Sequence, residues 1–315
     1  MTKFRRALPQ LQGTPFLTDG GLETSLIFHQ GAELPHFAAF VLLETEAGRA
    51  QLEAYYRPYL ELARDRGTGF VLDTPTWRAN PDWGDRLGYD EAALSEINRR
   101  AVAFLLDLRA EYETPATPCV VNGVVGPRGD GYKAGRMSAT EAQAYHAAQV
   151  GALTAAGADM VSCVTMTHPD EAIGIVRAAA AAAIPVVVSF TVETDGHLPS
   201  GPSLSEAISL VDAETAATPV YYMINCAHPS HFAGELRMGR AWMERIGGLR
   251  ANASAKSHAE LDESETLDDG DPEDLGRAYG ALMRLLPNLR VLGGCCGTDH
   301  RHVAAIGSAC LPVAA

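Results

Sequence analysis

The sequence has no excess of positive charge, no hydrophobic run long enough for a membrane helix and no nucleotide-binding motif. Its formal net charge of −14 argues against binding to nucleic acid or anionic membranes, which attract basic patches. The longest apolar run, Ala178–Phe190, contains Pro185 and is too short to cross a bilayer. No apolar region follows the basic start Met1–Arg6, so we expect no secretory signal and a cytoplasmic protein.

Nucleotide-binding loops are also missing. Asp19-Gly20-Gly21 follows an apolar run but lacks the G-x-G-x-x-G spacing of dinucleotide sites, and no P-loop occurs. The 315 residues are 47% hydrophobic, which is enough to bury a large core. In a reducing cytosol, the six cysteines are more often ligands or core residues than disulfides.

Short runs rich in β-branched residues alternate with helical patterns along the whole chain. The expected strands are Phe16–Gly21, Gly69–Thr76, Cys119–Pro127, Asp159–Thr165, Pro185–Thr191, Val220–Cys226, Ile246–Ser254 and Val291–Thr298. The expected helices are Ala50–Arg66, Glu91–Glu111, Thr140–Ala156, Glu171–Ala183, Ser205–Ala216, His231–Arg245, Pro272–Leu286 and Asp299–Ser308. Eight such units predict a parallel (β/α)8 barrel of one domain over residues 1–315, with a doubly wound open sheet as the alternative.

Three cysteines lie where expected strands give way to polar turns. Cys226 ends the sixth strand, and the adjacent Cys295 and Cys296 end the eighth. In a barrel these ends open onto one face, so three thiolates could bind one Zn²⁺ and leave its fourth position for a substrate. Gly293, Gly294 and Gly297 would let the backbone bend around the pair, and Thr298 or Asp299 would cap the next helix.

Other interpretations of these cysteines remain open. The adjacent pair could form a strained disulfide, act in redox chemistry or be two core thiols. Histidine could replace a cysteine ligand, although the nearby histidines are expected further out, at the surface or behind the ligands: His228, His231, His300 and His302. Cys119, Cys163 and Cys310 are expected to be ordinary core or surface thiols.

Two further features bear on the expected barrel mouth. The segment Glu260–Asp274 is dense in carboxylates, which indicates a solvated loop or a lid that attracts a cationic substrate. Aromatic residues near the mouth could face a cation by cation–π attraction; these are Trp77, Trp83 and Tyr222.

Nearly the whole chain resembles the homocysteine S-methyltransferase family, which includes betaine–homocysteine and S-methylmethionine–homocysteine methyltransferases. The motifs that carry the resemblance are Asp19–Leu26, Asp73–Trp77, Asn122–Pro127, Ser189–Thr191, Asn225-Cys226, Asn252–Ser254 and Gly293–Thr298. The resemblance implies a zinc-dependent barrel that activates homocysteine as a thiolate and takes a methyl group from a sulfonium or ammonium donor, as in methionine biosynthesis. It also implies the ligands Cys226, Cys295 and Cys296.

The resemblance further implies that Asp19 and the backbone of Gly20, Gly21 and Leu22 contact the amino acid. A Gly-rich turn can bind a carboxylate, and an aspartate can pair with an ammonium group. The other expected substrate contacts are Glu23, Thr74, Trp77, Glu193 and Asn225.

The chain departs from the family pattern at two positions. Val164 stands at the end of the fourth strand, where the family carries a glutamate for the amino group of homocysteine, and Arg250 stands where a tyrosine is common. Valine cannot pair with an ammonium group, so another acid (Glu193, Glu23 or Asp19) compensates or the acceptor is a different thiol.

The main functional prediction is a zinc-dependent S-methyltransferase for a small thiol acceptor and a cationic donor. One alternative is a diverged zinc barrel that works as a lyase or hydrolase through metal-bound water. Another is a thiol- or metal-binding protein without catalysis. The sequence leaves homo-oligomerisation open.

Overall fold

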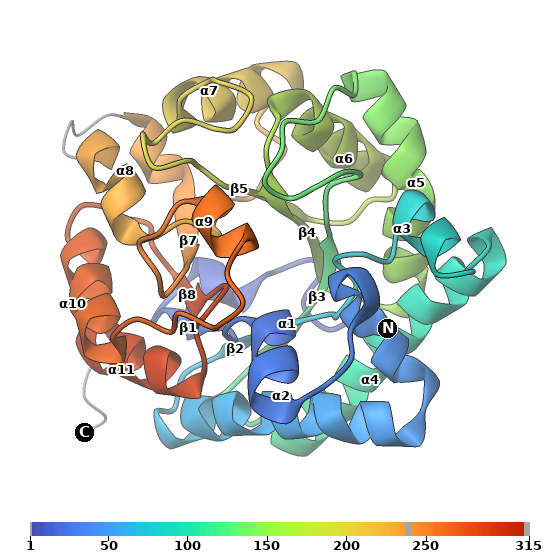
Figure 1. Ribbon diagram of the computed structural model, residues 1–315, viewed down its shortest axis with the longest axis horizontal. Helices are drawn as coiled ribbons and strands as arrows, with labels where there is room; N and C mark the ends of the chain where they lie inside the picture. The colour runs from blue at the N-terminus through green and yellow to red at the C-terminus, as the bar shows by residue number, and fades with distance from the viewer. Residues whose placement is uncertain (1, 237–240, 312–315) are drawn as a thin grey trace.

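Eight parallel strands form a closed barrel in the computed structural model, which describes residues 2–236 and 241–311 (Figure 1). The strands are β1 Phe16–Leu17, β2 Phe70–Asp73, β3 Cys119–Val125, β4 Met160–Met166, β5 Val186–Phe190, β6 Tyr222–Asn225, β7 Ile246–Ala251 and β8 Val291–Gly294. Each strand pairs with its neighbour in the sequence, and β1 pairs with β8 to close the ring. The predicted barrel is confirmed and the open sheet is excluded.

Helices surround the strands as the alternating pattern predicts. They are α1 Leu22–Thr24, α2 Glu46–Asp65, α3 Pro81–Arg86, α4 Glu91–Tyr112, α5 Ala139–Ala156, α6 Pro169–Ala181, α7 Leu204–Glu214, α8 Pro229–Leu236, α9 His258–Asp262, α10 Pro272–Met283 and α11 His300–Cys310. All seven residues of β3 are buried, as expected for a strand covered on both faces. No helix in the described ranges has the length and apolar character needed to cross a membrane.

The eight strands are confirmed, but several end earlier than predicted. β1 ends at Leu17 and β8 at Gly294, because the Gly-rich residues that follow turn across the barrel mouth. Within the predicted helix His231–Arg245, the structure describes the end of α8 and a 3-10 turn over Ala241–Arg245, and residues 237–240 lie outside the described part.

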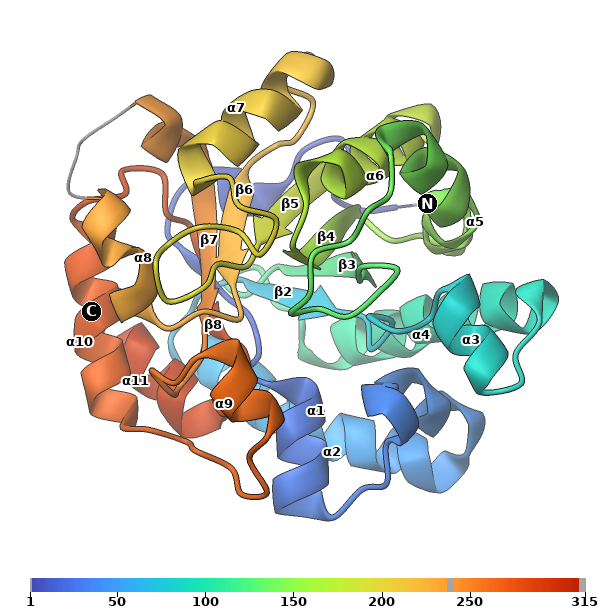
Figure 2. The same cartoon turned by 45° about the horizontal axis from the view of Figure 1, so that its top comes forward.

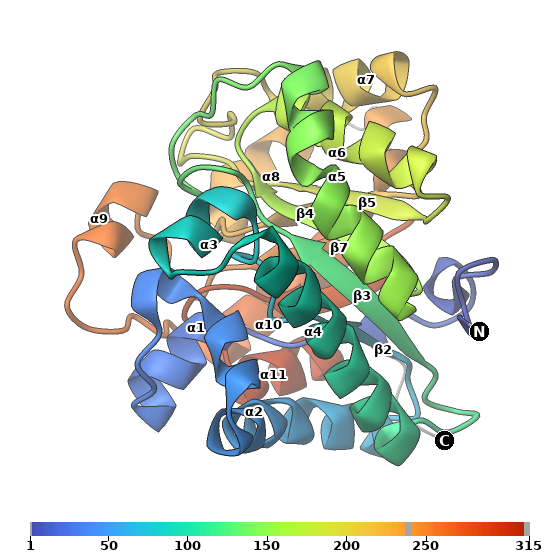
Figure 3. The same cartoon turned by 90° about the vertical axis from the view of Figure 1, so that its right-hand side faces the viewer.

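The mouth of the barrel lies at the carboxyl ends of the strands. α9 lies over this end (Figure 3). β6, β7 and β8 run side by side (Figure 2), so residues after β6 and β8 meet although about seventy positions separate them in the chain. The topology therefore brings distant polar turns to one face.

Candidate metal centre and substrate cavity

Three sulfur atoms meet at the barrel mouth. Sγ of Cys226, after β6, and Sγ of Cys295 and Cys296, after β8, all lie within 4.8 Å of one another. Tetrahedral zinc with bonds of about 2.3 Å places its sulfur ligands about 3.8 Å apart, so the cluster fits such an ion. In the described part of the chain, this is the one group of three or more His, Cys, Asp or Glu side chains close enough to share a metal.

The backbone is bent at each of these turns. Cys226 has a φ of 53° and Thr165, within the bulge in β4, has a φ of 60°. Such left-handed angles cost non-glycine residues about 1–3 kcal/mol and concentrate at functional sites. At Gly294, a Cβ atom would lie 2.0 Å from Oγ1 of Thr298, so this turn requires glycine.

Asn225 joins β4, β5 and β6 near their carboxyl ends. Its Oδ1 accepts hydrogen bonds from the backbone N–H of Thr165 at 2.9 Å and from the Ser189 hydroxyl at 2.6 Å. Its Nδ2 donates to Oγ1 of Thr165 at 2.8 Å and faces Sγ of Cys295 at 4.0 Å. Asn225 therefore fixes the strained Thr165 turn beside the sulfur atoms.

A stacked pair of rings covers the other side of the cluster. Tyr132 lies against His258 with ring centroids 4.2 Å apart, and the Tyr132 hydroxyl is 3.5 Å from Sγ of Cys296. Nε2 of His258 is 2.6 Å from the carbonyl oxygen of Cys226. These contacts connect the loop after β3 and helix α9 to the sulfur atoms.

The three thiols differ in their pKa. The pKa of Cys295 lies well below its ordinary value because Cys226 and Cys296 donate hydrogen bonds to its sulfur and the Arg250 charge favours the thiolate. The pKa of Cys226 lies well above its ordinary value because its proton is held by Cys295 and Cys296 and because it is buried. A bound cation would displace the remaining protons, as thiolate ligation requires.

A buried arginine neutralises two aspartates beneath the cluster. Arg250, at the end of β7, donates to Oδ1 of Asp19 at 2.7 Å and to Asp73, and its Nε donates to the carbonyl oxygen of Gly294 at 3.0 Å. Asp19 also accepts from Tyr55 at 2.9 Å. Burial raises the pKa of Asp73 to about 6, although the Arg250 charge opposes this shift.

A cavity of about 300 Å³ opens above the sulfur atoms. Its walls come from the turns after most strands and from the acidic segment that contains α9, which lies over the centre of the barrel (Figure 1). Leu261, Asp262, Leu267 and Asp268 of that segment line the cavity. The segment is an exposed loop after β7 that leads into α10, with Glu273 and Asp274 in the first turn of that helix, and it also forms part of the cavity wall.

Comparisons with known proteins agree with this geometry. The family model for homocysteine S-methyltransferase matches residues 16–310. The chain belongs to the homocysteine S-methyltransferase family. It is 28% identical over 251 residues to homocysteine S-methyltransferase from Escherichia coli strain K12, a match that covers 74% of this chain and 77% of that protein.

Solved structures of a homocysteine methyltransferase from the same organism share the fold. The oxidised form of E. coli MmuM is 25% identical with a TM-score of 0.73, and its metallated form is 23% identical with the same score. Both matches cover 96% of this chain and 98% of the other. This chain is thus a methyltransferase, and a relative of the same fold has been solved with a metal.

Most of the predicted substrate contacts of this homocysteine S-methyltransferase family member line the cavity. These are Asp19, Gly20, Gly21, Leu22, Glu23, Thr74, Trp77 and Asn225, together with Val164. The N–H of Gly21 is already donated to the carbonyl oxygen of Thr298 at 3.0 Å. The backbone N–H groups of Gly20 and Leu22 therefore remain as candidate donors to a substrate carboxylate.

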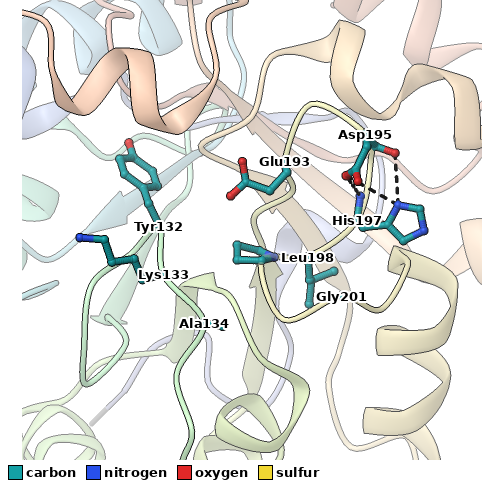
Figure 4. A pocket seen from close by; sticks show the side chains of 9 residues that line it. Tyr132, Lys133, Ala134, Glu193, Asp195, His197, Leu198 and Gly201 are labelled. Carbon is teal, nitrogen blue, oxygen red and sulfur yellow. Dashed lines mark hydrogen bonds and ion pairs between the residues drawn. The ribbon is translucent and has the colours of Figure 1, made fainter.

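Glu193 is not brought to this cavity. It lines a neighbouring pocket of about 510 Å³ beside Tyr132 and Asp195 (Figure 4), and its carboxylate lies 3.3 Å from Nδ1 of His258. Tyr132 lines both pockets and separates Glu193 from the sulfur atoms. Tyr222 is also outside the cavity, because its hydroxyl donates to Asp212 at 2.7 Å on the helical side of the barrel.

Histidines do not join the metal cluster within the described residues. His228 contacts Ser230 and His231 contacts the carbonyl oxygen of Ala255, while His300 is exposed. His302 is fully buried, where it contacts Asp299.

Sequence reasoning missed Arg250, Thr165, Tyr132 and Arg78 as parts of the site. Arg250 was noticed only as a departure from the family, and its position at the end of an expected strand was the available signal. Arg78 and Tyr132 lie in loops after β2 and β3, where no periodic pattern indicates which side chains turn inward.

Proposed function

We propose that this methyltransferase uses zinc held by Cys226, Cys295 and Cys296 to methylate the sulfur of homocysteine or a related thiol. The supporting observation is the cluster of three sulfur atoms at the floor of a cavity large enough for two small substrates. When bound, zinc would supply the electrophilic centre that lets a thiol with an ordinary pKa near ~8.5 ionise at neutral pH.

The methyl group would pass directly from the cationic atom of the donor to the acceptor sulfur. For a sulfonium donor, the methyl–sulfur bond breaks with its electron pair left on the donor, which becomes a neutral thioether. The acceptor thiolate supplies the pair for the new bond, and its proton goes to solvent. The residues of the cavity contribute by holding donor and acceptor in line and by excluding water.

The acceptor would lie between the Gly20–Leu22 turn and the sulfur atoms. Gly21 packs against Cys295, since a Cβ on Gly21 would lie 2.5 Å from the Cys295 carbonyl oxygen. Val164 provides an apolar wall. Because Asp19 is paired with Arg250 and Glu193 lies in the other pocket, we propose that Glu23 receives the acceptor's ammonium group.

The test combines metal analysis with methyl transfer. Purified protein is expected to bind one zinc and to methylate homocysteine from a sulfonium or ammonium donor in a mass-spectrometric screen of donors and acceptors. Cys226→Ser, Cys295→Ser and Cys296→Ser should each lose most of the zinc and nearly all turnover. Cys310→Ser, at the end of α11, is the matched control and should keep both.

Two outcomes would reject the proposal. One is a full complement of zinc with normal turnover in any of the three ligand variants. The other is an X-ray absorption spectrum of the zinc protein in which added acceptor thiol contributes no new sulfur ligand. A cytoplasmic location and homo-oligomerisation stay predictions, and light scattering of the purified protein measures the latter.

A further inference from the structure

An arginine that forms no ion pair with any residue in the described part of the chain borders the cavity. Arg78 follows β2 and is 8% exposed. Its guanidinium group lies between two indole rings, 4.0 Å from the ring centre of Trp77 and 3.8 Å from that of Trp83. Both Arg78 and Trp77 line the cavity. The stacking fixes the plane of the guanidinium group at the cavity wall.

The hydrogen-bonding capacity of Arg78 is mostly unused. Nη1 donates to the carbonyl oxygen of Gly129 at 2.9 Å, while Nε has no partner among the described residues. Asp130 and Glu23 line the same cavity and favour the charged form of Arg78, yet neither forms an ion pair with it. Burial nevertheless lowers the pKa of Arg78 to about 10.

A buried cation of this kind lowers the free energy of unfolding unless a ligand pairs with it. A buried charge without a counterion is unfavourable by several kcal/mol, and structures keep one mainly where function requires it. A planar guanidinium group matches a carboxylate, which can accept two of its N–H groups. The arrangement is therefore that of a carboxylate site which the protein itself leaves open.

Arg78 follows β2, which pairs with β1, and the turn after β1 already offers the N–H groups of Gly20 and Leu22 to the carboxylate of the proposed acceptor, which leaves Arg78 for the second substrate. The acceptor turn at Gly21 packs against Cys295, after β8. β2 stands four strands from β6 in the eight-stranded ring, so Arg78 follows a strand opposite the one that precedes Cys226. Beyond Trp77, Gly131 packs between that indole and the methyl group of Thr165, so the Arg78 loop adjoins the wall beside the sulfur atoms.

We propose that Arg78 binds the carboxylate of the methyl donor, an inference that rests on the proposed methyl transfer. The donor is then a sulfonium compound that carries a carboxylate. Its anionic end pairs with Arg78 at the wall, while its cationic sulfur faces the acceptor thiolate. Arg78 thus selects donors by charge and sets their orientation.

The test is binding to the zinc-loaded protein of two compounds that differ only in a carboxylate. S-methylmethionine has the group, and (3-aminopropyl)dimethylsulfonium lacks it. Wild type should bind the first about 10–100-fold more tightly by calorimetry, as expected for a charge-assisted pair. Arg78→Met should remove this difference by weakening S-methylmethionine alone, and Arg78→Lys should restore part of it.

Arg86→Met is the matched control. Arg86 also stacks on Trp83, at 4.4 Å, but is exposed and does not line the cavity, so this variant should bind both compounds as wild type does. As a second readout, S-methylmethionine should change the tryptophan fluorescence of Trp242→Phe, which retains the two indoles around Arg78, and this change should vanish when Arg78→Met is added.

Three results would overturn the inference. The first is that wild type binds the two compounds with equal affinity. The second is that Arg78→Met still binds S-methylmethionine more tightly. The third is that Arg78→Met weakens the binding of homocysteine and not of S-methylmethionine. The outcome is separate from that of the proposed function, because binding needs no turnover. Binding that depends on the carboxylate, without any methyl transfer, would support the Arg78 site and reject the proposed reaction. Methyl transfer that is unchanged in Arg78→Met would support the reaction and reject the Arg78 site.

Discussion

At the scale of single residues, Asp19 and Asp73 in the cavity are paired with an arginine, whereas Glu23 is not. Arg250 holds both Asp19 and Asp73, and Glu193 faces His258 in the other pocket. Glu23 lines the cavity and makes no ion pair with a described residue. Burial raises the pKa of Glu23 to about 7, and the nearby Cys295 and Asp19 charges act in the same direction. Glu23 therefore carries a proton at mildly acidic pH.

This shift predicts a pH-dependent stability. Because the folded pKa of about 7 exceeds the ordinary 4.5, the folded protein keeps a proton between these values that the unfolded chain has released. Stability should fall as pH rises through this window. Glu23→Gln should therefore unfold at a higher temperature than wild type above pH ~7, by about 2–4 °C for each kcal/mol, and at the same temperature near pH ~4.

Calorimetric scans across this range check the prediction. The exposed Glu33→Gln serves as the control and should follow wild type at every pH. An equal difference in unfolding temperature between Glu23→Gln and wild type at both ends of the pH range would contradict the prediction. The same variant should also raise the KM for an acceptor that carries an ammonium group, since the pairing charge is gone.

The cluster of three sulfur atoms was predictable from the sequence, whereas the residues that support it were not. Cys226 and the Cys295-Cys296 pair follow apolar runs directly, so strand order alone places them at one face. Thr165 adopts its left-handed backbone only because Asn225, from another strand, holds it. Such contacts join residues far apart in the chain and leave no local pattern.

At the scale of elements, the acidic segment forms a wall of the site. It begins with α9, whose His258 contacts the Cys226 carbonyl oxygen, and it continues over the cavity through Leu261 and Leu267. Ser254 donates to Asp268 at 2.8 Å, which fastens the segment to the end of β7. Of the two interpretations of its composition, this placement favours a cover whose carboxylates attract a cationic donor.

The role of this cover is testable by removing charge from its inner side. Asp262→Asn should lower kcat/KM for a cationic donor several-fold at low ionic strength, because a local negative potential increases the rate of encounter. The effect should shrink as salt is added, since the Debye length falls from about 30 Å at 0.01 M to about 8 Å at 0.15 M.

The neighbouring Glu265 offers a matched control. It belongs to the same exposed segment but does not line the cavity, so Glu265→Gln should change kcat/KM much less. Equal effects of the two substitutions, or an effect of Asp262→Asn that persists at high salt, would show that the carboxylates do not steer the donor.

At the scale of the whole molecule, the alternation of strands and helices determined the fold, and its prediction needed no tertiary information. The ends of the strands were less predictable. Thr18–Gly21 and Cys295–Thr298 have strand-like or small residues, yet they leave the sheet because Gly21 donates to Thr298 and Arg250 binds the backbone of Gly20 and Gly294. These turns are shaped by contacts across the barrel mouth.

With the same topology, a metal held by the three proposed cysteine ligands would link the last strands of the barrel. The ligands come from the turns after β6 and β8, with β7 between them, and β8 closes the ring on β1. Removal of zinc should therefore loosen the mouth on this side. An ion present at about 100 times its Kd stabilises a fold by about 2.7 kcal/mol, which corresponds to about 5–10 °C in Tm.

Chelation followed by hydrogen exchange examines this link directly. Metal-free protein should exchange faster at 222–226 and 294–298, while β3 and β4, on the other side of the ring, should keep their protection because their pairing does not involve the ligands. Addition of zinc should restore both Tm and protection. Uniform loss of protection around the barrel would mean that the metal stabilises the whole fold. No change in Tm or in protection would mean that a metal at the three sulfur atoms does not stabilise the fold.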